Sequence, residues 1–165
     1  MTGPSDIVRA MFAHHLWATE KLFDHLDGLP REQLDTEIAG TYGSILSTLT
    51  HLIDADGRYL VRLNDPSPPP YEDRGARRLA ELRADLAEHA RRWDGFLDQL
   101  DAGSLEATIA GRDDYPETPH AEGLLILQAI HHGNDHRTQI CSTLGALGHE
   151  VPDLDGWSFW AEGRG

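Results

Sequence analysis

Cysteine is almost absent from this 165-residue sequence, which contains only Cys141. No intrachain disulfide can form, as is typical of proteins in a reducing compartment. Residues 1–9 lack a basic start followed by an apolar run, so we expect no signal peptide. No stretch approaches the roughly 18 apolar residues that a membrane-spanning helix needs. We therefore expect a cytoplasmic protein with no membrane partner.

Basic residues are also scarce. The sequence has 14 Lys and Arg against 28 Asp and Glu, which gives a formal net charge of −14. Nucleic-acid binding depends on basic side chains that neutralise phosphates. The arginines of residues 74–92 are interleaved with acidic residues, a pattern that indicates a solvated helix face. We therefore expect no nucleic-acid partner.

Length and periodicity predict one domain over residues 1–165, with an all-α fold. The composition of 39% hydrophobic and 25% charged residues is ordinary for a globular protein. Four segments have apolar residues spaced by three and four, the spacing of an amphipathic helix: 5–29, 44–63, 75–100 and 119–147. These segments predict a four-helix bundle. The proline-rich stretch 64–70 is able to span the bundle, so a simple up-down-up-down order is not required.

Smaller signals refine this prediction. Pro119 is a favourable first residue for the last helix, and Gly148 is a favourable stop. Residues 106–110, followed by the turn-like 111–114, are compatible with a short strand pair before that helix. The tail contains three large rings, which we expect to fold back onto the bundle or to form a subunit contact: Trp157, Phe159 and Trp160.

Two histidines of the last segment, His132 and His136, lie four residues apart and share one helix face. Two neutral imidazoles one turn apart form half of a typical divalent-metal site. The chain has ten histidines, so chance alone supplies roughly 0.6 such spacings. The pair interrupts the apolar stripe of Leu125, Ala129, Ile140 and Leu144. Buried there, the imidazoles need a partner, which is the other imidazole, a carboxylate from another helix or a metal ion.

His51, in the second helical segment, is a third candidate ligand. Its neighbours on the same line of the helix, Thr48 and Ala55, are small and leave room for a ligand or a closely packed helix. A lone histidine in this setting is usually an ordinary core residue, but opposite the pair it would complete a three-imidazole site. Such a site leaves coordination positions open for water or substrate. The ion lowers the pKa of bound water or deprotonates a bound thiol.

Other catalytic patterns do not fit. A zinc-protease helix needs Glu directly after the first His, where this sequence has Gly133. A di-iron bundle needs two Glu-x-x-His motifs, and the one match, Glu117 to His120, is interrupted by Pro119. The sequence has no Gly-rich phosphate loop and no Ser nucleophile elbow.

The remaining histidines and the cysteine have ordinary interpretations. We expect Cys141 to be a small buried hydrophobic residue. His14 lies one turn from Trp17 and is the least certain of a group that we interpret as surface or helix-end residues: His14, His15, His25, His89, His120, His131 and His149.

Several of these stretches resemble one family. Residues 132–140 resemble the signature on the last bundle helix of the DinB-like (DinB/YfiT) superfamily. Gly43-Ser44-Ile45, leading to the stretch 49–52, resembles the second-helix signature of that family. Leu16-Trp17 and the stretch 148–155 are similar too. The resemblance therefore covers most of the chain.

The resemblance implies a four-helix bundle with a divalent metal ion, zinc or nickel, bound by His51, His132 and His136. The family includes S-transferases and isomerases that use low-molecular-weight thiols, as well as metal-dependent hydrolases, and many members are dimers. We therefore expect a homodimeric metal-dependent enzyme, a thiol S-transferase or a hydrolase, that acts on a small molecule. The alternative is a non-catalytic metal-binding or stress-related interaction bundle.

Two polar residues are candidates to support the site, whereas the sequence has no cluster of basic residues near the three histidines to recognise an anionic thiol. Asp54, one turn from His51, and Gln139 are candidates to support the ligands through hydrogen bonds. Arg137 is the nearest cation in the sequence, and two further arginines lie on the second helix: Arg58 and Arg62.

Overall fold

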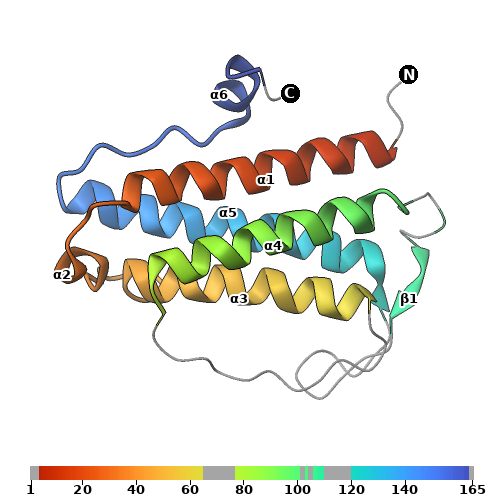
Figure 1. Ribbon diagram of the computed structural model, residues 1–165, viewed down its shortest axis with the longest axis horizontal. Helices are drawn as coiled ribbons and strands as arrows, with labels where there is room; N and C mark the ends of the chain where they lie inside the picture. Colours follow the sequence, from red (N-terminus) through yellow and green to blue (C-terminus); the bar gives the residue numbers. More distant parts are fainter. Residues whose placement is uncertain (1–3, 65–76, 101–102, 104–105, 110–119, 164–165) are drawn as a thin grey trace.

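The structure is a computed structural model that describes residues 4–64, 77–100, 103, 106–109 and 120–163 (Figure 1). Its long helices are α1 (Pro4–Leu26), α3 (Ile45–Asn64), α4 (Leu79–Leu97) and α5 (Glu122–Ala146). Two short helices are α2 (Arg31–Leu34) and α6 (Gly156–Ala161). The four long helices form a bundle, which confirms the predicted fold class.

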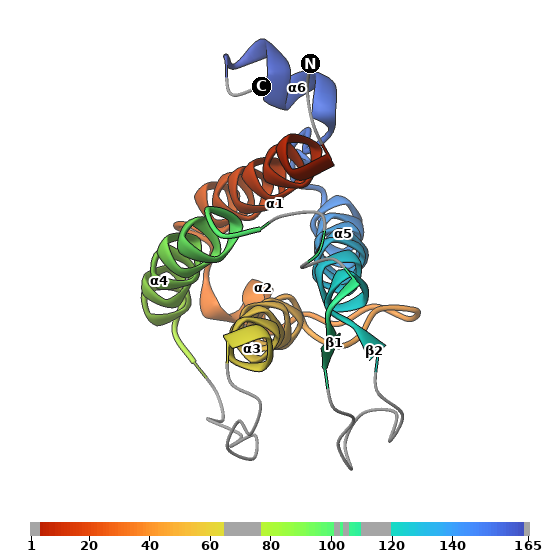
Figure 2. The same ribbon diagram turned by 90° about the vertical axis from the view of Figure 1, so that its right-hand side faces the viewer.

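The order of the helices around the bundle is not up-down-up-down. Viewed along the bundle, α1 lies opposite α3, and α4 lies opposite α5 (Figure 2). Helices α3 and α4 run in the same direction, and α1 and α5 run in the other (Figure 1). The first halves of α3 and α4 accordingly pack together, through Ile45, Leu49, Leu82 and Leu86. This order agrees with the prediction that the proline-rich stretch 64–70 does not require an up-down-up-down arrangement.

Glycines end two of the helices. Helix α1 ends at Leu26, earlier than the expected residue 29, because Gly28 takes a left-handed conformation with φ 84°. After α5, Gly148 has φ 81°, and the backbone N–H of His149 donates to the carbonyl of Leu144 at 3.0 Å. This hydrogen bond is typical of a glycine-terminated helix, as predicted for Gly148.

Helix α4 is shorter than the expected 75–100. The backbone N–H of Arg78 donates to Glu81 Oε2 at 3.1 Å, and this cap fixes the first residue at Leu79. Residues 75–76 lie outside the described part of the chain. Leu100 is buried although the helix ends before it, because a turn continues the apolar face beyond the helix.

A short strand pair precedes α5. Strand β1 (Thr108–Ile109) pairs antiparallel with β2 (His120–Ala121), with Thr108 opposite Ala121. The predicted strand is therefore confirmed, whereas the expected turn at 111–114 and Pro119 lie outside the described residues. Helix α5 begins at Glu122, later than expected, because the two residues before it pair as a strand.

Two large hydrophobic clusters fill the described interior between the four long helices, with polar residues between them. One cluster lies near α2 and includes Phe23, Leu49 and Leu144. The other includes Phe12 and Trp93 and lies toward the strand pair. Between them along the helices lies a layer of buried polar side chains: His15, Thr19, Asp54, Asp56, His89, His136 and Arg137. These residues need internal partners because water does not reach them.

The C-terminal tail returns to α1 through α6 (Figure 2). Phe159 packs edge-on against Trp17, with ring centroids 5.3 Å apart. Trp157 and Trp160 are 81% and 67% exposed, so only one of the three rings folds back onto the bundle. Their alternative role in a subunit contact stays a prediction. No helix within the described residues is long and apolar enough to cross a membrane.

Candidate metal centre

The three predicted histidines come together between α3 and α5. Nε2 of His132 lies 3.0 Å from Nε2 of His51 and 3.1 Å from Nε2 of His136. The ligand atoms of all three lie within 4.8 Å of one another. The small neighbours Thr48 and Ala55 are buried, as expected where α3 approaches another helix closely.

The donor set fits a divalent ion. Nδ1 of His136 donates to Gln139 Oε1 at 3.1 Å, which leaves a lone pair on Nε2. One proton on Nε2 of His132 satisfies only one of its two short contacts, whereas a cation accepts lone pairs from all three nitrogens. Tetrahedral bonds of 2.0–2.1 Å place ligand nitrogens roughly 3.3 Å apart, close to the distances here. Imidazole ligands suit zinc, copper, iron and nickel ions.

The surroundings of His51 and His132 favour the neutral form of these two imidazoles near pH 7. Burial, together with the neighbouring His136 and Arg58, lowers the pKa of His51 to about 4. Burial also lowers the pKa of His132 to about 4, again with contributions from the other two imidazoles. A neutral imidazole is the form that binds a metal ion.

Gln139 connects one ligand to the loop before α3. Its Oε1 accepts hydrogen bonds from Nδ1 of His136 and from the backbone N–H of Tyr42, both at 3.1 Å. The expected supporting role of Gln139 thus has a direct structural basis.

Tyr42 covers part of the site and was not identified from the sequence. Its ring stacks on His51 with centroids 4.2 Å apart and 19° between planes, and it meets His136 edge-on at 5.3 Å. The side chain is 55% exposed, so it stands between the imidazoles and solvent. Nothing local to Tyr42 predicts this contact, because it depends on how the loop folds against α5.

Asp54 differs from its expected role. Its Oδ1 accepts from Arg77 Nη1 at 3.2 Å, just before α4, so the carboxylate is directed to another helix. The charge of Asp54 only opposes the lowering of the pKa of His51 that burial causes. The three residues from His51 to Asp54 are less than a full turn, so Asp54 reaches Arg77 just before α4 while His51 faces α5.

The three arginines named from the sequence lie in different surroundings. Arg137 is buried and binds residues of α1 and α5, so it is not the cation of the metal site. Arg62 is buried near the far end of α3. Arg58 is the cation whose charge lowers the pKa of His51 and of His132.

Two of the remaining histidines contradict their interpretation as surface residues. His15 is fully buried and His89 is 6% exposed, both in the polar layer of the core. His14 holds the tail, since its Nε2 contacts the carbonyl of Leu154 at 2.8 Å. His131 is exposed as expected. The side chain of His120 lies outside the described part.

Cys141 is half-buried against the cluster near α2, and burial raises the pKa of its thiol. It is therefore a small, mostly apolar side chain with a neutral thiol at pH 7, close to the prediction.

Comparison with known proteins places the chain in a family. The model of the DinB family matches residues 2–164, so the chain belongs to the DinB family. YfiT from Bacillus subtilis, described as a probable metal-dependent hydrolase with an unusual four-helix bundle topology, has a TM-score of 0.68 at 18% identity over 91% of this chain and 92% of its own. A DinB-like protein from Bacillus cereus has a TM-score of 0.62 at 19% identity, covering 82% and 89%. No curated protein matches the sequence.

Proposed function

We propose that this DinB-family protein is a metal-dependent enzyme whose divalent ion, zinc or nickel, is held by His51, His132 and His136. The observation that carries the proposal is the convergence of three Nε2 atoms, with His132 at 3.0 and 3.1 Å from the other two. Three protein ligands are typical of a catalytic site, because a structural site is closed by four.

The residues around the ligands have distinct roles in this proposal. Gln139 orients His136 and fixes its tautomer through Nδ1. Tyr42 shields the imidazoles from solvent on the side of His51. The bound ion supplies a water or a thiol of lowered pKa, and neutral ligands leave its full charge available for this.

The substrate is a small molecule, and the reaction is hydrolysis or thiol S-transfer. Hydrolysis is supported by the description of YfiT, which shares this fold at 18% identity. Thiol transfer is supported by the family resemblance of the ligand motifs and would use a low-molecular-weight thiol, which a reducing, cytoplasmic setting supplies. The family resemblance also implies a homodimer, which sedimentation equilibrium tests directly.

Metal analysis of protein purified without chelators tests the ligand set. We expect about one ion per chain in the wild type and a loss of the ion in His136→Ala. His131→Ala is the matched control, because His131 is an exposed histidine of the same helix. Equal metal content in wild type and His136→Ala would overturn the proposal. Assays with several small thiols, and with water alone, then separate transferase from hydrolase, and inactivity in all would favour the non-catalytic bundle.

A further inference from the structure

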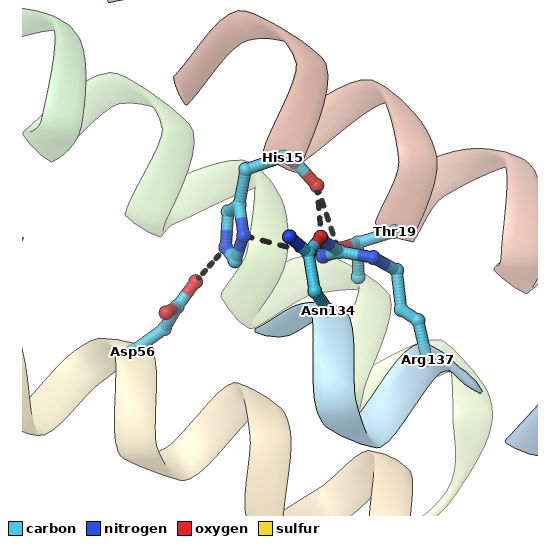
Figure 3. A network of polar contacts seen from close by, with 5 residues as sticks. All are labelled: His15, Thr19, Asp56, Asn134 and Arg137. Carbon is cyan, nitrogen blue, oxygen red and sulfur yellow. Dashed lines mark hydrogen bonds and ion pairs between the residues drawn. The ribbon is translucent and has the colours of Figure 1, made fainter. Parts of the chain in front are cut away.

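A buried polar network joins helices α1, α3 and α5 (Figure 3). His15 projects from α1 between Asp56 of α3 and Arg137 of α5. Its Nε2 lies 2.8 Å from Asp56 Oδ2, and its Nδ1 lies 3.2 Å from Arg137 Nη1. The side chains of His15 and Asp56 are both 1% exposed, so water does not replace these contacts.

The chemistry of the partners fixes the proton on His15. A guanidinium group only donates, so Nδ1 of His15 accepts from Arg137. Nε2 therefore carries the proton, and this N–H donates a hydrogen bond to the carboxylate of Asp56. The neutral imidazole thus connects a buried anion on α3 to a buried cation on α5, and each charge has a partner.

Further contacts hold the guanidinium group of Arg137 in place. Nη1 donates to Thr19 Oγ1 at 2.8 Å and to the carbonyl of His15 at 3.2 Å. Nη2 donates to Asn134 Oδ1 at 2.6 Å. Arg137 of α5 therefore contacts two residues that lie one turn apart on α1, His15 and Thr19.

Gly133 allows this close approach. A Cβ atom at that position would lie 2.3 Å from Cε1 of His15 and 2.6 Å from its Nδ1. A side chain there would push α5 away from α1 or displace His15. The glycine and the network therefore specify one position of α5.

The network residues alternate with the candidate metal ligands along α5. Gly133 and Asn134 directly follow His132, and Arg137 directly follows His136. On α3, Asp56 stands five residues after His51. Helix α1 supplies none of the three candidate ligands, yet His15 joins the two helices that do supply them.

We propose that His15 is a positioning residue of the metal site, which sets α3 against α5 so that His51 meets His132 and His136. This inference rests on the proposed metal function. Apolar contacts between the same helices are non-directional, whereas the donor and acceptor geometry of His15 permits one register. In this proposal the network holds the three ligand nitrogens close to one another.

Two substitutions of His15 separate positioning from packing. His15→Leu replaces the imidazole with an apolar side chain of similar size and removes both hydrogen bonds of the ring. In His15→Gln the amide oxygen is able to accept from Arg137, and the amide N–H is able to donate to Asp56. The control is Leu22→Ala, which creates a cavity in the cluster near α2 on the same helix.

The readouts are zinc affinity, measured by competition with a chromogenic chelator, and the visible absorption spectrum of the Co²⁺-loaded protein. We expect His15→Leu to bind zinc about 10–100-fold more weakly, with an altered Co²⁺ spectrum. His15→Gln should recover most of the affinity. Leu22→Ala should lower the melting temperature and keep both the affinity and the spectrum.

The possible results distinguish this inference from the proposed function. Wild-type affinity and spectrum in folded His15→Leu would overturn the positioning role alone. Absence of zinc binding by the wild type would overturn both. If His15→Leu does not fold, Asn134→Ala takes its place, because it removes one acceptor of Arg137 at an exposed position. Its affinity must then fall in the same direction, and an unchanged affinity would count against the inference.

Discussion

Gln139 accepts a hydrogen bond from Nδ1 of His136 at 3.1 Å and thereby directs the lone pair of Nε2 toward His132. Replacing Gln139 with Leu removes the acceptor that fixes this tautomer. We expect zinc affinity to fall about 10–100-fold, as for other residues that orient a ligand. Isothermal titration with zinc measures the change. Ser142→Ala, at an exposed position of the same helix, is the control, and equal losses in both variants would contradict the prediction.

Tyr42 should control access to the ion rather than its affinity. The phenol ring stacks on His51 while remaining 55% exposed, so its contribution to stability is small, about 0.5–1.5 kcal/mol. We expect Tyr42→Ala to release metal faster to a small chelator, as followed by stopped-flow absorbance. Tyr42→Phe keeps the ring and should keep the wild-type rate. Faster release from Tyr42→Phe than from Tyr42→Ala would show that the hydroxyl group matters instead.

The metal-free protein should lose stability as the pH falls. The pKa of His51 and of His132 is about 4 in the folded chain, against about 6.5 in the unfolded chain. The unfolded chain therefore binds more protons between these values, so stability is complete above pH ~6.5 and is lost as the pH falls toward ~4. Urea unfolding of chelator-treated protein at several pH values measures this slope.

The matched variant for the pH prediction replaces both histidines with glutamine. Other groups titrate in the same range, so the informative quantity is the difference between wild type and His51→Gln/His132→Gln. We expect the double variant to have a shallower loss of stability below pH ~6.5. Parallel curves would contradict the assigned pKa shifts.

Gly133 should tolerate no side chain. The Cβ of Gly133→Ala would meet His15 at 2.3 Å, and His15 is held on both sides by Asp56 and Arg137. We expect a loss of about 1–3 kcal/mol, since crowding a packed core has this cost even though alanine favours a helix.

Gly95→Ala is the control for the crowding at Gly133. Gly95 lies in α4, and a Cβ atom there meets nothing within 4 Å. That variant should gain up to about 1 kcal/mol from helix propensity. Urea or thermal unfolding of both proteins measures the two changes, and a stabilised Gly133→Ala would contradict the close approach of α1 and α5.

Much of the fold follows from local patterns. Apolar residues at helical spacing predict the four long helices, and Gly148 predicts where α5 ends. The four-residue spacing of His132 and His136 places both imidazoles on one face of one helix, wherever that helix packs. Helix starts are less predictable, because the pairing of β1 with β2 depends on residues far apart in the sequence.

Contacts between helices account for what the sequence did not reveal. From their neighbours in the sequence, His15 and His89 are predicted to be surface residues, and Asp54 is predicted to support His51. Their true neighbours depend on the order of helices around the bundle, in which α3 and α4 run in parallel (Figures 1 and 2). A periodic pattern identifies the apolar face of each helix, but it does not show against which other helix that face packs.

The long helices, the family motifs and the histidines on them are thus predictable from the chain alone, because they depend on short-range spacing along one element. The folded structure is needed to see that His51 meets the pair, that Tyr42 covers it and that His15 joins Asp56 to Arg137. These contacts join residues from 9 to 122 positions apart, as for Tyr42 with His51 and His15 with Arg137. The directional hydrogen bonds and close packing that specify them exist only once the helices have assembled.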